Sequence, residues 1–593
     1  MLATWEGQEA LVLGYISALA QTISLYIALA ITYFGWGKAA IRVLGVSNSA
    51  ERLPTTLIWL GWAVTLFLFQ ILHLFLPITA SVAIPVIVFG IAFSVSEILA
   101  VFRRWPRKSS SLALLVVVLL VFLALAIWIA SRSMLAPTNT DSGGYHFCAI
   151  RWINSYPIVH GLGNLHGRLA FNQSFFLYVA ALNIYPYFGH GHAVANSFLL
   201  LLTIATCLDF LRPVFGYPSL LIRAHPFQYL SALFALPVLG YLSLFSSDLS
   251  SPSPDLACTL LQLVMFLMLA RGITQWLEGQ TDQQYQAILL VVFAVTAVTV
   301  KLSNLAFSAA IILFPMLYIL RKSTSRLRGM IQLITPIAAI MAIWCLRSVI
   351  LSGAPFYPST IGYVPLEWAV PKAKIIDEAN WIYSWARQPD VHWSIVLGNW
   401  EWLKPWILTI VEHEKSDMLY PIALFGFFCI TTSVFVIVKS AKPLRWLEWA
   451  ILFPPILGLV YWFFTAPDPR FANALFFLAS MSAILLFVRS IGNSFNFRTL
   501  SSLICLAFIL GNLHFVRLAI IYRHLVKEIS LFGYQPIKVA PLKEIATRSG
   551  VTLYIPQVLG NCWDAPLPCT PYFNTALKLR KPGDLGSGFK AAE

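Results

Sequence analysis

Several acidic and basic residues stand at the ends of long apolar runs in this 593-residue chain. Asp141 lies in PTNTDSGGYHF, directly after one run, and Asp255 ends SSPSPD just before another. Lys301 interrupts the apolar stretch around VTVKLSN, Arg347 ends a run, and Arg470 lies in TAPDPRF between two runs. A lysine at membrane depth needs a partner or a water-filled cavity. A carboxylate that meets fixed cations suits a reaction in which a base deprotonates a hydroxyl group while positive charge holds a departing phosphate.

Each of these groups also has a purely structural explanation. Asp141 and Asp255 could cap the helices that follow them, and the Lys301 ammonium could extend along its own stem to the membrane surface. Asp468 and Arg470 could form a simple ion pair within TAPDPRF. Scattered caps, however, do not explain cations placed inside apolar runs. We therefore favour one shared site to which several runs contribute.

The composition places these residues in a polytopic membrane protein. The chain is 59% hydrophobic and 11% charged, with a mean hydropathy of +0.76, whereas about a quarter of the residues in soluble proteins are charged. The first apolar run follows MLATWEGQEA, which has no basic segment, so we expect a span there and not a signal peptide. Runs of bilayer length predict an all-α fold of about fourteen spans. They are 11–34, 56–77, 80–101, 112–131, 190–211, 228–247, 255–275, 286–302, 305–320, 330–350, 419–438, 447–465, 471–488 and 499–521.

The basic residues predict the orientation of these spans. With fourteen spans, the stretches FRRWPRK, RKSTSRLR and KSAKPLR all fall on one side, which the positive-inside rule makes cytoplasmic. The net charge of +15 therefore reports topology, and we expect no nucleic-acid partner. The segments 132–189, 246–255, 351–418 and 522–593 face outward, and they hold nearly every unusual polar residue. The predicted site is extracytoplasmic.

The outward tail, residues 522–593, contains the one pair of cysteines that are close in sequence. Cys562 and Cys569 close the short loop NCWDAPLPCTPY, and an oxidising compartment would join them as a disulfide. The other six cysteines are scattered, mostly in apolar runs, where they suit small core positions. Alternation in VTLYIPQVLG indicates strands, so we expect a small extracytoplasmic α+β cap.

The outward loop 351–418 holds seven of the chain's twenty tryptophans. Trp381 and Trp385 are spaced one helical turn apart, which predicts a helix. Such a helix could be anchored at the membrane interface by its tryptophans. Alternatively, the rings could stack on sugars or guide a lipid tail, and either arrangement is compatible with a lid over the site.

Familiar catalytic motifs are missing from the sequence. It contains no P-loop, dinucleotide-binding fingerprint, HExxH or nucleophile elbow. Energy-rich nucleotides are in any case cytoplasmic. A transfer reaction on the outer side therefore needs a donor that arrives through the membrane, such as a sugar on a lipid phosphate.

The order of these features resembles the GT-C class of integral membrane glycosyltransferases, which includes protein O-mannosyltransferases and aminoarabinose transferases. In that class a first external loop opens with a catalytic acid, as TNTDSGGYH does with Asp141, and continues with a surface helix, as YHFCAIRWI would. SGAPFYPS and PDPRF match later elements of the class. GLGNLHGRLAFNQSFF, SSPSPD, KLSN and CWDAPLPCTPY look like a poorly characterised bacterial subfamily.

The resemblance runs from about residue 112 to the end and implies a division of the chain. Residues 1–111 form an N-terminal transmembrane extension, and 112–350 form the GT-C-like core with its first external loop, 132–189. The Trp-rich loop, 351–418, leads to the C-terminal transmembrane helices, 419–521, and to the tail, 522–593. The implied location is the bacterial inner (plasma) membrane.

The resemblance also implies an inverting hexosyltransferase that acts in cell-envelope glycan assembly or modification. Asp141 would deprotonate an acceptor hydroxyl, which attacks the anomeric carbon of a polyprenyl-phosphate sugar. The acceptor would be a glycan, a lipid or a protein. The implied phosphate ligands are Lys301, Arg470 and Arg347, and the implied substrate contacts are Tyr145, His146, His166, Arg168, Asp255 and Asp468.

No soluble cofactor is required by this scheme. The first-loop acid of the class is often followed by or paired with another acid, but here Ser142 follows Asp141. Asp255 is the nearest candidate for the second acid. The sequence leaves open whether Asp141 and Asp255 hold a divalent metal ion.

The main alternative is a multi-pass lipid or glycan transporter, or flippase, which would also have many spans and a polar cavity. Transporters usually show inverted repeats and broken helices near the membrane midplane. This sequence has no clear internal repeat, and its polar residues gather at one face. A polysaccharide polymerase or ligase of another fold is a further alternative.

Overall fold

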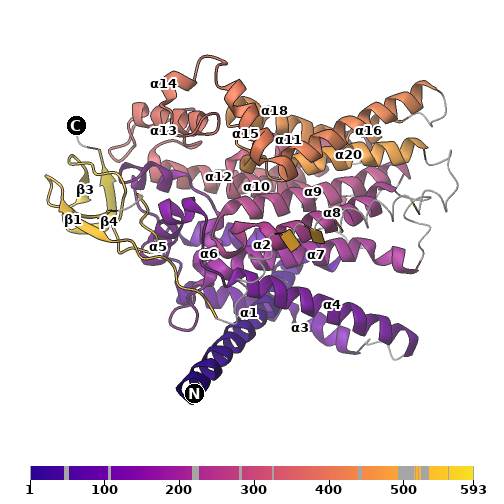
Figure 1. The fold of residues 1–593 in the computed structure, drawn as a ribbon, viewed down its shortest axis with the longest axis horizontal. Coiled ribbons are helices and arrows are strands. Elements are labelled where there is room, and N and C mark those ends of the chain that lie inside the picture. The colour runs from indigo at the N-terminus through magenta and orange to yellow at the C-terminus, as the bar shows by residue number, and fades with distance from the viewer. Residues whose placement is uncertain are drawn as a thin grey trace.

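The structure is a computed structural model in which most of the chain is described. The described ranges are 2–45, 53–103, 109–216, 226–279, 284–322, 326–438, 444–491, 533–557 and 560–591, with a few single positions between 502 and 521. Helices make up most of these ranges and pack as a bundle, with β-strands at one end (Figure 1). The helical architecture expected from the composition is confirmed.

Nine described helical segments are long and apolar enough to cross a membrane, and four shorter apolar helices lie in α3, α4, α10 and α20. Together they correspond to every predicted span except the last, 499–521, most of which lies outside the described residues. The total of fourteen spans and the GT-C arrangement stay predictions. The long helices are α1 (Leu2–Val43), α2 (Pro54–Leu72), α3 (Ala80–Arg103), α4 (Ser109–Ser133), α7 (Gly191–Gly216), α8 (Pro226–Phe245), α9 (Pro254–Leu277), α10 (Gln284–Val300), α11 (Leu305–Lys322), α12 (Arg326–Ser352), α16 (Tyr420–Ile437), α18 (Phe453–Thr465) and α20 (Leu475–Ile491).

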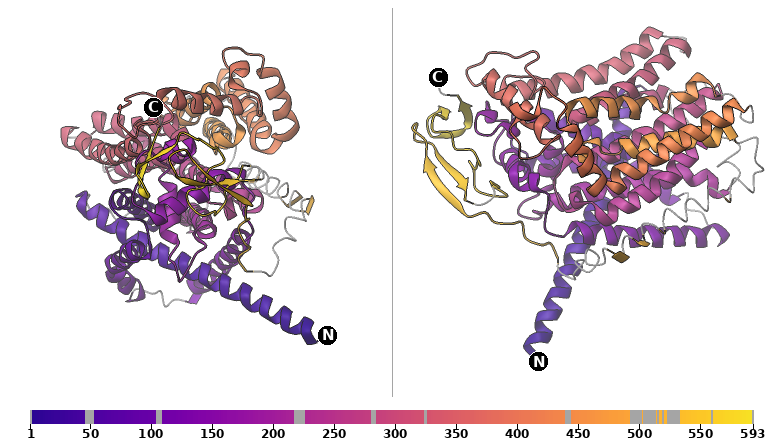
Figure 2. Two further views of the ribbon diagram at one scale, coloured as in Figure 1. Left: turned by 90° about the vertical axis from the view of Figure 1, so that its left-hand side faces the viewer. Right: turned by 45° about the horizontal axis from the view of Figure 1, so that its top comes forward.

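The burial of each helix depends on its place in the bundle. In the apolar window of α9, 94% of the residues are buried inside the protein, whereas in that of α16 only 11% are. Both helices are apolar on every side, so the exposed face of α16 is a surface that lipid would cover. This contrast is typical of a multi-pass membrane protein. The long helix α1 packs on α2 and α3, and its N-terminal end projects beyond the bundle (Figure 2).

The chain breaks between α10 and α11 from Lys301 to Asn304, close to the predicted division between the spans 286–302 and 305–320. The Lys301 backbone is extended, and the Asn304 side chain donates to the carbonyls of Ala297 (3.1 Å) and Lys301 (3.3 Å). Gln262 Nε2 in turn donates to Asn304 Oδ1 (2.8 Å). Carbonyls at the end of a helix need such partners. The KLSN sequence therefore ends α10 and leaves Lys301 at one end of the bundle.

Basic residues lie at the opposite end of the bundle from Lys301. Arg321 lies in the last turn of α11, which runs away from Lys301, and Arg326 and Arg328 lie in the first turn of the next helix. Arg489 lies in the last turn of α20, which runs in the same direction as α11. This placement follows from the alternating directions of the helices (Figure 1). The predicted basic side and the predicted site thus lie at opposite ends.

The described part of the tail is made of strands. β1 (Leu542–Ala546) pairs antiparallel with β2 (Thr552–Pro556), and β3 (Lys578–Lys581) pairs antiparallel with β4 (Asp584–Lys590). The described residues of 533–557 and 560–591 contain no helix, so the helical part of the expected α+β cap is not found there. Prolines in APLPCTP disfavour a helix in this region. The disulfide between Cys562 and Cys569 is present as predicted.

The tail covers the loop 132–189, which the sequence predicts to face outward. That loop contains a π-helical turn (Ser142–His146), α5 (Phe147–Ser155) and α6 (Phe175–Leu182). The Trp563 backbone amide donates to the Gly143 carbonyl (2.8 Å), and the Trp152 ring meets the Phe589 ring in an edge contact. The helix expected at YHFCAIRWI is therefore present, but it is buried beneath the tail strands (Figure 2).

The Trp-rich loop folds into three helices, α13 (Lys372–Trp385), α14 (Trp393–Val396) and α15 (Leu403–His413). Trp381 and Trp385 both belong to α13, as their spacing predicted. Trp406 donates from Nε1 to the Pro467 carbonyl (2.8 Å) and packs beside Trp462 at the end of α18. Part of the loop is thus held by protein contacts at the same end of the bundle as Lys301.

Candidate functional site

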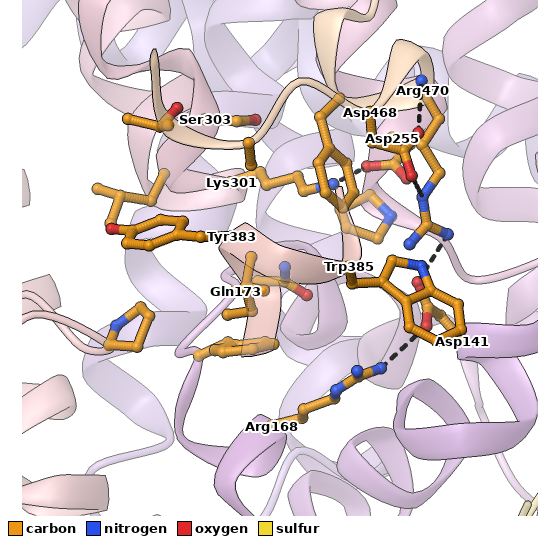
Figure 3. Close-up of a pocket in the computed structure, with 18 of the residues that line it drawn as sticks. Asp141, Arg168, Gln173, Asp255, Lys301, Ser303, Tyr383, Trp385, Asp468 and Arg470 are labelled. Atoms are coloured by element: carbon orange, nitrogen blue, oxygen red, sulfur yellow. Dashed lines mark hydrogen bonds and ion pairs between the residues drawn. The ribbon is translucent and has the colours of Figure 1, made fainter. Parts of the chain in front are cut away.

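A cavity of about 580 Å³ opens where the loop 132–189, the Trp-rich loop and several helix ends meet. The first turn of α9, the break before α11 and the last turn of α18 all contribute to it (Figure 3). Polar and aromatic side chains dominate the lining. They include Thr140, Asp141, Tyr145, His146, Arg168, Gln173, Asp255, Lys301, Ser303, Tyr357, Tyr383, Trp385, Tyr461, Trp462, Asp468, Arg470 and Phe471.

The Asp141 carboxylate lies between two guanidinium groups. Its Oδ1 is 3.1 Å from Arg168 Nη1, and its Oδ2 is 2.9 Å from Arg470 Nη1 (Figure 3). The side chain accepts no hydrogen bond from the start of the following helical turn. The helix-cap explanation is therefore wrong for Asp141. Its own backbone amide donates to Asn139 Oδ1 (2.9 Å), which fixes the start of the turn.

The two arginines set the charge of Asp141. Burial raises the pKa of this carboxyl, but the Arg470, His146, Arg168 and Lys301 side chains oppose it, and the pKa lies below its ordinary value of 3.8. Asp141 is therefore ionised at neutral pH. Burial lowers the pKa of the neighbouring His146 to about 4, so that ring is neutral at the same pH.

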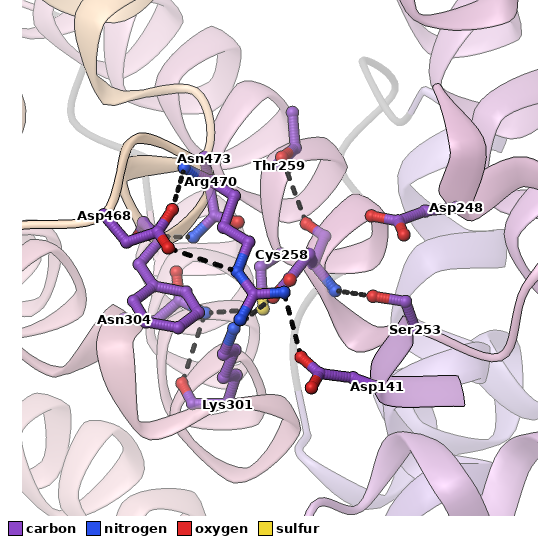
Figure 4. Close-up of polar contacts among 12 residues, drawn as sticks. Asp141, Asp248, Ser253, Cys258, Thr259, Lys301, Asn304, Asp468, Arg470 and Asn473 are labelled. Carbon is purple, nitrogen blue, oxygen red and sulfur yellow. Dashed lines mark hydrogen bonds and ion pairs between the residues drawn. The ribbon is translucent and has the colours of Figure 1, made fainter. Parts of the chain in front are cut away.

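Lys301 forms a second ion pair, with Asp255, at the wall of the cavity. Ser253 is the residue that caps α9, because its Oγ accepts from the Asp255 amide (3.3 Å). The Asp255 carboxylate is thus free to meet the Lys301 ammonium (Figure 3), and Figure 4 shows Arg470 close to Lys301. The predicted lysine partner is a carboxylate, and Lys301 does not extend away from the site.

Arg470 and Lys301 approach the same aromatic ring. The Arg470 guanidinium carbon is 4.7 Å from the centroid of the Phe471 ring, and Lys301 Nζ is 4.3 Å from it. Asp468 begins the helical turn α19 (Pro469–Ala472) by accepting from the Arg470 amide (3.0 Å). Asp468 Oδ2 also lies 3.6 Å from Arg470 Nε. The simple ion pair within PDPRF therefore exists, and it aims Arg470 at Asp141.

Two of the predicted site residues lie outside the cavity. Arg347 is only 3% exposed and donates to Asn172 Oδ1 (3.2 Å) and to the Gln70 carbonyl (3.2 Å). Arg347 contacts the loop that precedes α6, because the end of α12 packs against that loop. His166 is buried beside Tyr572 of the tail, with ring centroids 5.2 Å apart. The other predicted substrate contacts, Tyr145, His146, Arg168, Asp255 and Asp468, do line the cavity.

The sequence reasoning missed groups that reach the site from α13 and from short loops. Glu378 Oε1 on α13 lies 3.7 Å from Arg168 Nε and so ties the Trp-rich loop to the first loop. Tyr383 on α13 and Gln173 before α6 line the cavity. The tryptophan spacing predicted the helix α13, but it gave no sign of which face of that helix would meet Arg168.

The described residues do not fit a divalent metal ion. No group of three or more His, Cys, Asp or Glu side chains with the geometry of a metal site occurs among them. Asp141 and Asp255, the two acids considered for a metal, already face arginine and lysine. Cations so close would compete with a metal ion for these carboxylates.

A family model matches most of the chain. The family is described as Domain of unknown function (DUF8201), and the match covers residues 20–478. It includes most of the predicted N-terminal extension and ends before the tail. The curated proteins gave no match, and neither did the solved structures.

Proposed function

The chain belongs to this family of unknown function, and we propose from its site that it is an integral membrane glycosyltransferase. It moves a hexosyl group from a polyprenyl-phosphate donor to an acceptor hydroxyl on the extracytoplasmic face, with inversion, in cell-envelope glycan assembly or modification. The observation that carries the proposal is the meeting of Asp141, Arg470 and Lys301 in one cavity, although they come from segments far apart in sequence.

Asp141 is the general base in this proposal. It is ionised at neutral pH and lines the cavity, so it can accept the proton of an acceptor hydroxyl as that oxygen attacks the anomeric carbon. The bond between the anomeric carbon and the phosphate oxygen breaks as the new bond forms, and polyprenyl phosphate leaves. Arg168 holds one carboxylate oxygen and fixes the direction of the other. Its second partner, Glu378, keeps this arginine in place.

Lys301 and Arg470 receive the charge of the leaving polyprenyl phosphate. Arg470 uses Nη1 on Asp141 and Nε near Asp468, which leaves Nη2 for a phosphate oxygen. Lys301 lies on the same Phe471 ring, so one phosphate group can contact both cations. Positive charge fixed in place before the reaction stabilises the leaving group without reorganisation.

The location of the cavity favours an enzyme over a transporter. Its lining comes from helix ends and external loops, whereas transporter sites lie near the membrane midplane. The basic residues Arg321, Arg326 and Arg328 mark the opposite end of the bundle. The positive-inside rule makes that end cytoplasmic, which supports an extracytoplasmic site in a plasma membrane.

Transfer by the full-length protein in lipid nanodiscs tests the proposal. Labelled polyprenyl-phosphate glucose and polyprenyl-phosphate mannose are offered with a total cell-envelope fraction as acceptor. We expect release of polyprenyl phosphate and labelling of the envelope with at least one donor. Lys301→Ala should abolish both signals, and Arg328→Ala, which removes an exposed cation at the other end of the bundle, should leave them unchanged.

Mass spectrometry of envelope glycans from cells with and without the gene provides the independent readout. Loss of one hexose from a defined glycan is the expected change. An unaltered glycan profile, together with no turnover of either donor, would reject the transferase.

A further inference from the structure

The loop before α6 holds the Gln173 side chain at the cavity, because hydrogen bonds fix the residues on either side of Gln173. Asn172 Nδ2 donates to the Trp344 carbonyl (2.7 Å), and the Trp344 indole donates back to the Asn172 carbonyl (3.0 Å). On the other side, the Ser174 amide donates to the Thr299 carbonyl (2.9 Å), and the two hydroxyls are 2.9 Å apart. Gln173 between them therefore has a fixed backbone.

Asn172 adopts a backbone conformation that non-glycine residues rarely adopt. Its φ is +51°, in the left-handed region, which is unfavourable for a side chain. The Arg347 guanidinium donates to Asn172 Oδ1 (3.2 Å) and helps to hold it there. Arg347 thus has a role that the sequence did not suggest. It supports the loop through its contact with Asn172 and does not line the cavity.

The Gln173 side chain has no partner among the described residues. It is 9% exposed, it lines the cavity, and its buried Oε1 accepts no hydrogen bond. Figure 3 shows its carboxamide directed into the same cavity as the head groups of Lys301 and Arg168. A buried amide without a partner costs free energy. A fixed loop that keeps such an amide at a cavity is arranged for a ligand that supplies the missing hydrogen bond.

Ser303 presents a second unpaired polar group to the cavity. In the KLSN break, Lys301 pairs with Asp255 and Asn304 bonds to helix carbonyls, but the buried Ser303 Oγ has no partner within the described chain. Ser303 and Gln173 both line the cavity. Their loops are joined through the bonds between Ser174 and Thr299, so the two groups belong to one rigid wall.

The charges in the cavity are already matched, and this limits what the wall can bind. The acids Asp141, Asp255 and Asp468 each face a cation, and those cations are Arg168, Arg470 and Lys301. In the proposed function the donor phosphate contacts Lys301 and Arg470, so a charged substituent on the sugar would find no further opposite charge at this wall. A carboxamide and a hydroxyl each donate and accept, as a sugar hydroxyl does.

We propose that Gln173, together with Ser303, forms the subsite that recognises the hydroxyl groups of an uncharged sugar. The inference rests on the proposed function and adds the sugar class to it. Uronic acids and amino sugars are disfavoured, because they bring a charge that this wall cannot neutralise. Gln173 is a specificity residue in this scheme, since it contacts the sugar and takes no part in the proton transfer.

Donor binding to the full-length protein, followed by tryptophan fluorescence, tests the subsite. The probes are polyprenyl-phosphate glucose and polyprenyl methyl phosphate, which carry the same diester charge and differ in the sugar. Wild-type protein should bind the sugar probe more tightly. Gln173→Met keeps the size of the side chain and removes its amide, and it should erase on the order of tenfold of that preference while leaving the methyl probe unchanged. Gln388→Ala, which alters a glutamine outside the cavity lining, should match wild type.

The remaining outcomes separate the two proposals. Equal weakening of both probes by Gln173→Met would mean that the residue only shapes the pocket, and the subsite would be rejected. Equal or tighter binding of a polyprenyl-phosphate uronic acid or amino sugar by wild type would also reject it. Failure of wild type to bind either diester, with the protein folded, would instead reject the lipid-phosphate donor and with it the proposed function.

Discussion

Replacing Asp141 by asparagine tests the proposed base with little change of shape. Asn keeps one oxygen for an arginine and loses the negative charge and the proton-accepting power of the carboxylate. Both arginines retain another acidic partner in the variant. Arg168 remains 3.7 Å from Glu378, and Arg470 remains 3.6 Å from Asp468. The site should therefore stay assembled without its base.

The magnitudes separate catalysis from stability. A positioned general base contributes roughly 10²- to 10⁴-fold to a rate, so we expect the turnover of Asp141→Asn to fall by that factor. The carboxylate is 18% exposed and makes two charge-assisted contacts. Weakening them should lower the free energy of unfolding by about 1–3 kcal/mol. A loss of this size is measurable by thermal unfolding, which separates reduced stability from a reduced rate.

The assay is release of polyprenyl phosphate from a labelled donor by protein in nanodiscs, with thermal unfolding followed in parallel. Glu378→Gln is the matched control. Glu378 is the other carboxylate partner of Arg168, and Glu378 itself does not line the cavity. Its replacement should change turnover less than about tenfold, because such a partly exposed ion pair contributes little. If Asp141→Asn retains turnover within tenfold of wild type, or if both variants lose activity equally, the assignment of the base is wrong.

Two further predictions concern the surroundings of Asp141. Burial raises the pKa of Asp141, and among the groups that lower this pKa Arg470 has the largest effect. Arg470→Gln should therefore raise the pKa of Asp141. The acid limb of the pH–rate profile should then move to higher pH, and an unmoved limb would show that Arg470 does not set the charge of the base. Gly143→Ala should destabilise the contact between the first loop and the tail, because the new methyl carbon would lie 2.6 Å from the Trp563 ring. Limited proteolysis should release the tail faster in Gly143→Ala than in Gly144→Ala, whose nearest neighbour would be at 3.7 Å, and equal rates would contradict the packing.

The sequence by itself determined the general architecture. Apolar runs of bilayer length can only be helices in a membrane, because each backbone group must find its partner within its own segment. The sequence also placed a division between the runs 286–302 and 305–320, and the break from Lys301 to Asn304 lies at this point. The pairing of Cys562 and Cys569 followed from their closeness in the chain and their predicted outward position.

The sequence also identified the chemical groups but not all of their partners. It selected Asp141, Lys301 and Arg470, because charged groups at the ends of apolar runs are conspicuous. It gave Arg347 the same weight, although that side chain faces the buried loop beside Asn172. All four residues lie near the end of an apolar run, and nothing in the sequence distinguishes Arg347 from the three that line the cavity.

Only the tertiary structure decided which of these groups meet. Asp141 and Arg470 are separated by most of the chain, and their contact depends on how each helix end is rotated about its axis within the bundle. That rotation is set by packing between helices that are apolar on every side, so no periodicity in the sequence reveals it. The same holds for Glu378 and Gln173. Their side chains reach the site because α13 lies over it and because neighbouring residues fix one short loop, and both conditions arise from contacts that form only in the folded protein.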